Sequence, residues 1–188
     1  IMTITLHPGS VTLAQLQTIY WNGESARLEH TFDAAINRAA ARIAEIASGS
    51  EPVYGVNTGF GKLARVRIPP ADIAELQRHL VLSHMCGVGP VLDAGTVRLV
   101  LVLKAASLGL GRSGVRRPTL EALLTLLAHD ALPLIPAQGS VGASGDLAPL
   151  AHVAAALIGV GRIDLAGTRL PAADALRAIG QAPLQLAA

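Results

Sequence analysis

The sequence predicts a mainly α-helical protein, and three observations support this prediction. Hydrophobic residues make up 51% of the 188-residue chain but aromatic residues only 3%. The core must therefore be aliphatic, which favours packed helices over a sandwich of aromatic-rich strands. Apolar residues recur at helical spacing in several segments, and two glycine-rich stretches without that spacing lie between them. We therefore expect a single helical domain, residues 1–188, with two long functional loops.

The first helix signals lie near the amino terminus. Residues 12–15 read Thr-Leu-Ala-Gln, which has the form of a capping box and predicts a short helix through about Tyr20. A second helix is predicted from Asp33 to about Ser48, because apolar residues repeat there at helical spacing while charged residues take other faces. Gly49 then occupies the place of a left-handed helix cap.

Helical periodicity is lost over residues 51–70, where three glycines fall within seven residues. Long irregular segments in compact domains are usually functional or disordered. Further helices are expected over residues 72–83, 93–108, 118–129, 147–159 and 172–179. The second glycine-rich loop, "LPLIPAQGSVGASG", precedes the helix expected from residue 147.

Charge and cysteine content narrow the possible partners. The 15 Lys and Arg residues against 13 Asp and Glu give a net charge of +2, which implies neither a nucleic acid nor a membrane partner. The longest apolar segments, residues 97–110 and 147–160, are interrupted and fall short of the roughly 18–20 residues of a membrane span. Cys86 is the only cysteine, and the amino terminus lacks a signal-peptide pattern, so we expect a cytoplasmic protein. The apolar ending "QAPLQLAA" suggests a truncated chain.

Two common site motifs are present only in part. A phosphate-binding Walker loop needs four residues between its glycines and a hydroxyl after its lysine, but here five residues intervene and Leu63 follows Lys62. His79, His84 and Cys86 lie close together, yet the histidines do not share a helix face and no further thiol or carboxylate completes a ligand set. We therefore expect neither a nucleotide loop nor a metal site.

The most informative stretch is residues 139–152, "GSVGASGDLAPLAH", which places Ser144 between glycines at the mouth of a predicted helix. The serine-hydrolase pattern Gly-x-Ser-x-Gly fails, because position 146 is Asp. A purely structural alternative is a helix cap, since Ser144 and Asp146 are both favoured at that position and a carboxylate suits the helix dipole. Residues 143–146 alone do not decide between a helix cap and a chemical role.

Taken whole, this stretch closely resembles the signature of the aromatic amino acid ammonia-lyases. The resemblance implies that Ala143, Ser144 and Gly145 cyclise without any enzyme into a methylidene-imidazolone, an electrophilic prosthetic group, so that no external cofactor is needed. The residue types suit that chemistry, because a side chain on Gly145 would obstruct attack by its nitrogen and Ser144 supplies the hydroxyl that is lost. We expect Gly142 to leave the backbone accessible and Asp146 to polarise the loop.

A second segment, "YGVNTGFG" at residues 54–61, resembles the mobile active-site loop of the same family. The resemblance implies that Tyr54 is the catalytic base. A phenol with an ordinary pKa near ~10 is a poor base at neutral pH, so the surroundings would have to stabilise the phenolate. The alternative is a loop aromatic packed on the core.

The pair Ser83-His84 resembles the one found in histidine-specific members, whereas members that act on other aromatic amino acids tend to carry Phe-Leu or His-Leu. The resemblance implies that L-histidine is the substrate and that urocanate and ammonia are the products. His84 could exchange a hydrogen bond with the substrate imidazole, whereas a phenyl ring would leave it unpaired. The alternative is a helix-end histidine that faces water.

Members of the family are more than twice as long as this chain. The resemblance implies the amino-terminal part of the ammonia-lyase/fumarase-like fold, inactive alone, with a homotetramer formed by the complete enzyme. The alternatives are a tyrosine or phenylalanine ammonia-lyase or an aminomutase of the same family, and, from another class, a non-enzymatic helical assembly module.

Overall fold

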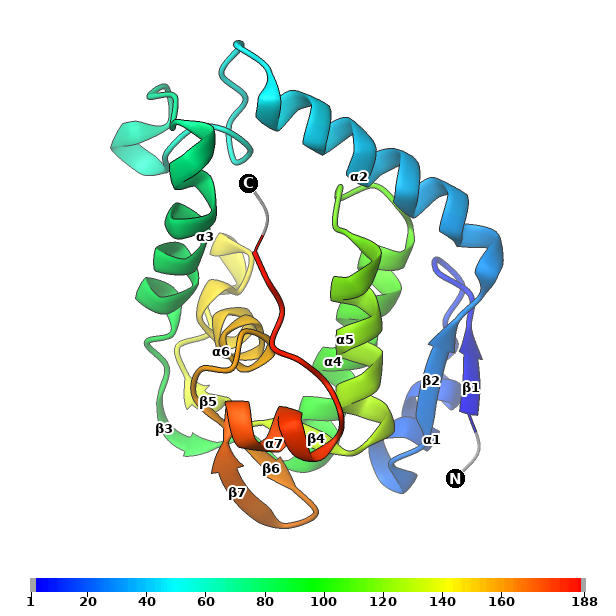
Figure 1. Cartoon of the computed structure of the whole chain (residues 1–188). Coiled ribbons are helices and arrows are strands. Elements are labelled where there is room, and N and C mark those ends of the chain that lie inside the picture. The colour runs from blue at the N-terminus through cyan, green and yellow to red at the C-terminus, as the bar shows by residue number, and fades with distance from the viewer. Residues whose placement is uncertain (1–2, 187–188) are drawn as a thin grey trace.

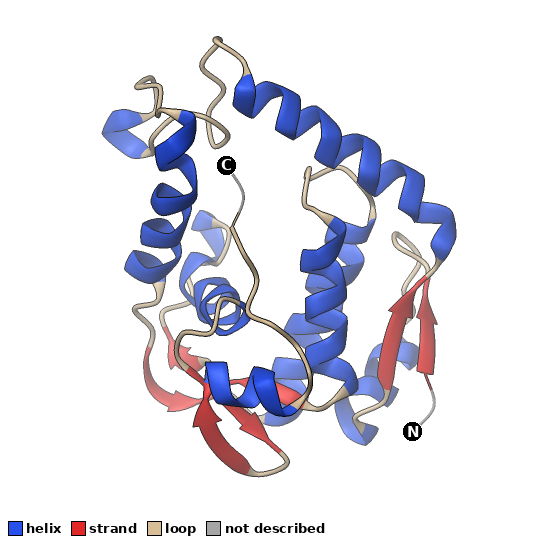
Figure 2. Ribbon diagram, in the orientation of Figure 1, coloured by secondary structure: helices blue, strands red, loops and turns tan. Residues whose placement is uncertain are grey.

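The computed structural model describes residues 3–186 and confirms a mainly helical architecture (Figures 1 and 2). The helices in this range are α1 (Leu13–Asn22), α2 (Asp33–Ser48), α3 (Pro70–His84), α4 (Ala94–Gly109), α5 (Arg117–Ala128), α6 (Leu147–Leu157) and α7 (Ala172–Ala178). The strands are β1 (Thr3–Leu6), β2 (Ser25–Leu28), β3 (Val88–Val91), β4 (Ala131–Pro133), β5 (Pro136–Gln138), β6 (Arg162–Leu165) and β7 (Thr168–Pro171).

All seven helices fall on segments predicted from the sequence. The capping box at the start of α1 is formed in both directions, and the bounds of α2 are those predicted. The expectation for Gly49 is wrong, because its φ of −71° and ψ of 170° are extended rather than left-handed. The free carbonyl of Ile46 is satisfied instead by the Gly49 N–H at 3.0 Å and by the Asn57 amide at 3.2 Å, so a left-handed cap is not required.

None of the strands was predicted from the sequence. Strands β1 and β2 pair in parallel and are connected through α1, β3 pairs antiparallel with β5, and β4, β6 and β7 form an antiparallel sheet. Each strand has only three or four residues, too few for an alternating pattern to stand out. Part of the predicted second loop is therefore β4 and β5.

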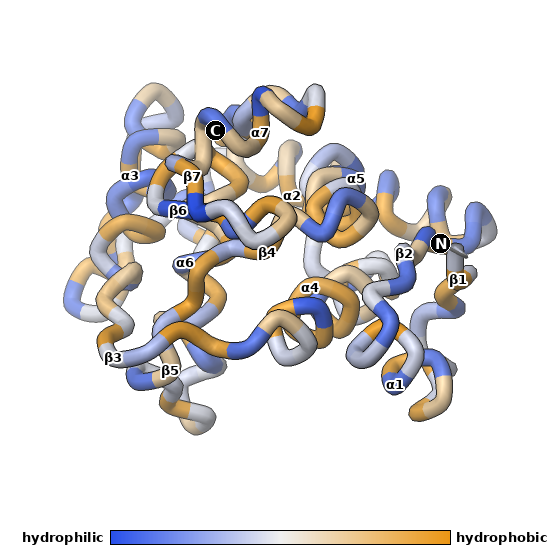
Figure 3. The backbone as a smooth tube through the Cα atoms, turned by 90° about the horizontal axis from the view of Figure 1, so that it is seen from below, coloured by the Kyte–Doolittle hydropathy of each residue, from blue (hydrophilic) through white to orange (hydrophobic). Residues whose placement is uncertain are grey.

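The core lies where α4 and α5 pack together and against β2 and β4. Leu101, Val102 and Leu126 are at most 1% exposed, and hydrophobic residues run along much of both helices (Figure 3). The aliphatic composition predicted such a core. This packing provides the rigid framework on which the two glycine-rich loops are carried.

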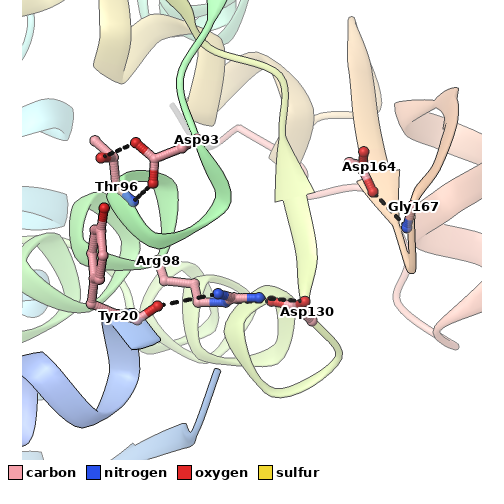
Figure 4. Close-up of polar contacts among 7 residues, drawn as sticks. All are labelled: Tyr20, Asp93, Thr96, Arg98, Asp130, Asp164 and Gly167. Atoms are coloured by element: carbon pink, nitrogen blue, oxygen red, sulfur yellow. Dashed lines mark hydrogen bonds and ion pairs between the residues drawn. The ribbon is translucent and has the colours of Figure 1, made fainter. Parts of the chain in front are cut away.

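Arg98 on α4 ties three elements together at the edge of the core (Figure 4). Its Nε and Nη2 donate to the carboxylate of Asp130 at 2.7 and 2.8 Å, and its Nη1 donates to the Tyr20 carbonyl at 3.3 Å. The hydrogen bond with Asp130 raises the pKa of the Arg98 guanidinium. The two-pronged contact fixes the turn after α5 against α1 and α4.

Candidate functional site

The signature loop, residues 139–146, runs from β5 to the start of α6. Its centre is a single 3-10 turn, Gly142–Ser144. The backbone N–H and the hydroxyl of Ser144 both donate to the Val141 carbonyl, at 2.9 and 2.7 Å, and the Gly145 N–H donates to the Gly142 carbonyl at 3.3 Å. These bonds hold Ala143, Ser144 and Gly145 in a compact turn.

Asp146 does not cap α6 with its side chain, although it stands at the position before the helix. Its backbone is left-handed, with φ of 62° and ψ of 46°. One carboxylate oxygen, Oδ1, accepts from the Ser140 hydroxyl at 2.5 Å. Ser144 does not cap the helix either, because its hydroxyl donates to Val141. The helix-cap interpretation of this stretch is therefore wrong.

The turn has the space and the backbone shape that a ring closure needs. Ala143, Ser144 and Gly145 are exposed, and a Cβ added at Gly142 or Gly145 would meet nothing within 4 Å. Gly145 has a φ of +83°, which glycine adopts without strain. The residues present therefore fit a methylidene-imidazolone formed from these three residues.

The beginning of the signature loop lies against the segment that follows α3. The Gly87 N–H donates to Nε2 of His152 on α6 at 3.2 Å. A Cβ added at Gly139 would lie only 3.1 Å from the Gly87 Cα, so the two backbones are in close contact. Since α3 also packs on α6, the structure brings the carboxyl end of α3, with Ser83 and His84, close to the signature loop.

His84 is half-buried at the carboxyl end of α3. Its Nδ1 lies 2.8 Å from the Leu80 carbonyl and 3.2 Å from the Ser83 hydroxyl, which itself donates to the same carbonyl at 3.0 Å. Because a carbonyl can only accept, this contact places the ring proton on Nδ1. Nε2 is then an acceptor, and it has no hydrogen-bond partner within the described range of the chain.

Tyr54 lies in the tyrosine loop, which we define as residues 51–69, and its side chain is 64% exposed. Its ring makes an edge contact with Phe60, with 5.7 Å between the ring centroids, and its hydroxyl has no hydrogen-bond partner among residues 3–186. The alternative of an aromatic packed on the core is therefore wrong. The hydroxyl is open to a reacting molecule.

The polar anchor of the tyrosine loop is Asn57, which is 1% exposed. Its Oδ1 accepts from the Val53 N–H at 2.7 Å, and its Nδ2 donates to the carbonyls of Ile46 and Glu51 at 3.2 and 2.9 Å. The Asn57 carbonyl also accepts from the Ile68 N–H at 2.9 Å. The side chain thus fixes the loop to the end of α2 and has no free group for chemistry.

Within one chain the tyrosine loop and His84 lie at opposite ends of α3 (Figure 1). The loop leads directly into the amino terminus of α3, and His84 is the last residue of that helix. A helix of 15 residues is about 22 Å long. The segment that follows His84 therefore meets the beginning of the signature loop, whereas the tyrosine loop joins the other end of α3.

Sequence reasoning assigned no role to His152, although it lies within the signature. Burial lowers the pKa of its imidazole. Its Nε2 accepts from Gly87, so the neutral ring is the form that joins α6 to the segment after α3. The only sequence signal was a histidine inside an apolar helix, a pattern that is equally common in ordinary cores.

This burial predicts a pH-dependent stability. Between the ordinary pKa near ~6.5 and the lower pKa of folded His152, the unfolded chain binds more protons, so stability is lost as pH falls through that window. We expect the free energy of unfolding, measured by urea denaturation, to fall from about pH 7.5 to about pH 5.5, and to fall less in His152→Gln, whose amide oxygen accepts without titrating. An equal fall in both proteins would show that His152 does not cause it.

In the part of the chain that the structure describes, no group of three or more His, Cys, Asp and Glu side chains is arranged to hold a metal ion. In that same part, no helix has the length and apolar character needed to cross a membrane.

Comparison with known proteins gives a consistent result. The histidine ammonia-lyase of Roseobacter denitrificans is 57% identical over 187 residues, which cover 100% of this chain and 36% of that protein. The crystal structure of histidine ammonia-lyase from Trypanosoma cruzi is 33% identical with a TM-score of 0.90, over 99% of this chain and 36% of that one. A tyrosine aminomutase from Streptomyces globisporus is 31% identical with a TM-score of 0.91, over 99% and 35%.

The chain therefore spans about a third of the length of these relatives. The family model for aromatic amino acid lyase matches residues 11–188, which include the tyrosine loop, the Ser83-His84 pair and the signature loop. A match of this extent, together with the compact Ala-Ser-Gly turn, shows that the chain belongs to the aromatic amino acid lyase family.

Proposed function

We propose that this chain is the amino-terminal part of an ammonia-lyase that converts L-histidine to urocanate and ammonia. The observation that carries the proposal is the exposed, compact turn of Ala143, Ser144 and Gly145, held close to the end of α3 that bears Ser83 and His84. The 57% identity to a histidine ammonia-lyase supports histidine as the substrate.

The turn supports a ring closure in which no oxidant is consumed. The Gly145 nitrogen bonds to the Ala143 carbonyl carbon, and the Ala143 oxygen leaves as water with the hydrogens of the Gly145 and Ser144 nitrogens. The Ser144 hydroxyl leaves as a second water with the Ser144 Cα hydrogen. Once formed, the methylidene-imidazolone supplies an electrophile that eases the expulsion of ammonia. Gly142 leaves the approach to this turn open.

The remaining site residues act on the substrate. Nε2 of His84 accepts a hydrogen bond from the substrate imidazole N–H, and Ser83 contacts the same end of the substrate. The Tyr54 phenolate removes the β-proton. Because the tyrosine loop and His84 adjoin opposite ends of α3, the site takes its Tyr54 from another copy, in agreement with a homotetramer of the full-length enzyme and with inactivity of this chain alone.

The binding partner, the cofactor and the cellular compartment follow from the same proposal. The partner is a small amino acid rather than nucleic acid or a membrane, and the prosthetic group comes from the chain itself rather than from an external cofactor or a metal. A single cysteine suits the reducing cytoplasm.

Intact mass with a peptide map across residues 139–150 tests the proposal directly. We expect a protein of the length of its relatives to lack the mass of two waters, localised to Ala143, Ser144 and Gly145. Ser144→Ala should not lose both waters, because it has no hydroxyl to expel. An unmodified mass in the long wild-type protein would contradict the lyase and favour a helical assembly module, which has no reason to lose water.

The likeness to a tyrosine aminomutase favours one second candidate. An aminomutase returns the amine to the product, whereas a lyase releases it. Product analysis of the long protein with L-histidine, L-tyrosine and L-phenylalanine would separate the two activities and the three substrates. Urocanate and free ammonia from histidine are the expected products.

A further inference from the structure

Ser140 makes an unusual contact across the signature loop. Its hydroxyl donates to Asp146 Oδ1 at 2.5 Å. The bond joins two residues six positions apart, and the segment between them contains the whole of Ala143, Ser144 and Gly145. It therefore closes the signature loop around the turn that is proposed to cyclise.

The backbone beside this bond carries strain. Gly145 and Asp146 are both left-handed, with φ of 83° and 62°. Glycine adopts this region freely, and Asp is one of the few other residues that adopt it, when its short side chain makes a local hydrogen bond. The Asp146 side chain makes such a bond with Ser140, its only side-chain hydrogen bond within residues 3–186.

The left-handed pair also sets the path of the chain out of the turn. The peptide between Gly145 and Asp146 turns the chain back into α6, while the Gly145 N–H reaches the Gly142 carbonyl at 3.3 Å, a long hydrogen bond. If Asp146 relaxed to an ordinary conformation, the chain would leave the turn in another direction and the closed signature loop would open. A closed loop samples fewer open conformations, so the Gly145 nitrogen stays within reach of the Ala143 carbonyl carbon for more of the time.

We propose that Ser140 is a positioning residue for formation of the prosthetic group, which acts by holding Asp146 in its left-handed conformation. This inference rests on the proposed function. It changes the expected role of Asp146, whose carboxylate serves as the anchor of a clamp rather than as a group that polarises the loop. Ser140 itself touches none of the atoms that form or break bonds.

The test follows the loss of two waters over time by intact mass, in the long protein after rapid refolding. Ser140→Ala removes the hydroxyl, and we expect cyclisation to slow by about tenfold or more, since a hydrogen bond to a charged group is lost. Ser140→Thr keeps the hydroxyl and should cyclise at nearly the wild-type rate. Ser113→Ala is the matched control, because Ser113 is an exposed serine in the turn between α4 and α5.

A double variant separates the clamp from a general effect on folding. If Ser140 acts through Asp146, then Ser140→Ala combined with Asp146→Ala, which removes the acceptor of the bond, should cyclise no more slowly than Asp146→Ala alone. Additive slowing, a normal rate in Ser140→Ala, or a Thr variant as slow as the Ala variant would each overturn the inference. A wild-type protein that never loses two waters would instead overturn the proposed function, so the two failures are distinguishable.

Discussion

Replacing Tyr54 by Phe in the long protein is expected to lower kcat for ammonia release by about 10² to 10⁴, the usual contribution of a positioned acid or base. The change removes one oxygen from a ring that is 64% exposed and has no hydrogen-bond partner among residues 3–186. We therefore expect the substitution to change the free energy of unfolding little, since the edge contact with Phe60 is retained. Steady-state kinetics with L-histidine would measure the effect.

The other tyrosine of the chain is the control for this experiment. Tyr20 lies on α1, and its ring packs against Gly95 near the start of α4. Tyr20→Phe should leave kcat nearly unchanged, and both variants should still lack the mass of two waters. A Tyr54→Phe enzyme with normal kcat would remove Tyr54 from the role of base while leaving the prosthetic group untouched.

The largest effect on stability is expected from Gly111→Ala, in the turn after α4. A Cβ at this position would lie 2.6 Å from the Ala35 carbonyl carbon and 2.7 Å from the Ile36 nitrogen, both in the backbone of α2. A helix backbone cannot move aside as a side chain can. The clash and the left-handed φ of +68° together should lower the free energy of unfolding by about 2–5 kcal/mol.

Gly167→Ala separates the clash from the backbone strain. Gly167 lies in the turn between β6 and β7 with a φ of +81°, and a Cβ there would meet nothing within 4 Å. It should cost only about 1–2 kcal/mol, from the conformation alone. If urea denaturation gave the same loss for both variants, the close packing of α2 on the turn after α4 would be wrong.

The sequence was most informative where a local pattern determines the structure. The capping box of α1 and the regular apolar spacing of α2 act within one or two turns, so both helices could be predicted. The short strands depend on partners far along the chain, as β1 does on β2, and no local pattern reveals such pairing. Gly49 was misassigned for a similar reason. The Ile46 carbonyl at the end of α2 accepts a hydrogen bond from Asn57 in the tyrosine loop, a contact that no local pattern reveals.

The candidate site divides in the same way. The residues of the signature loop and of Ser83-His84 could be picked out because their order in the chain is distinctive. Their arrangement could not be, since the contact between Gly87 and His152 depends on the packing of α3 on α6. The Ser140–Asp146 bond depends on backbone handedness at residue 146, which the sequence does not display.

The anchoring of the tyrosine loop by Asn57 has a consequence for how this region can evolve. The residue that secures the loop and the residue that presents the hydroxyl are three positions apart, yet one is 1% exposed and the other 64%. Selection can therefore act on them separately. Substitutions at Tyr54 can alter the reaction with little penalty to folding, whereas substitutions at Asn57 strip hydrogen bonds from buried backbone groups. The reaction can thus change through substitutions at Tyr54 while Asn57 keeps the loop folded.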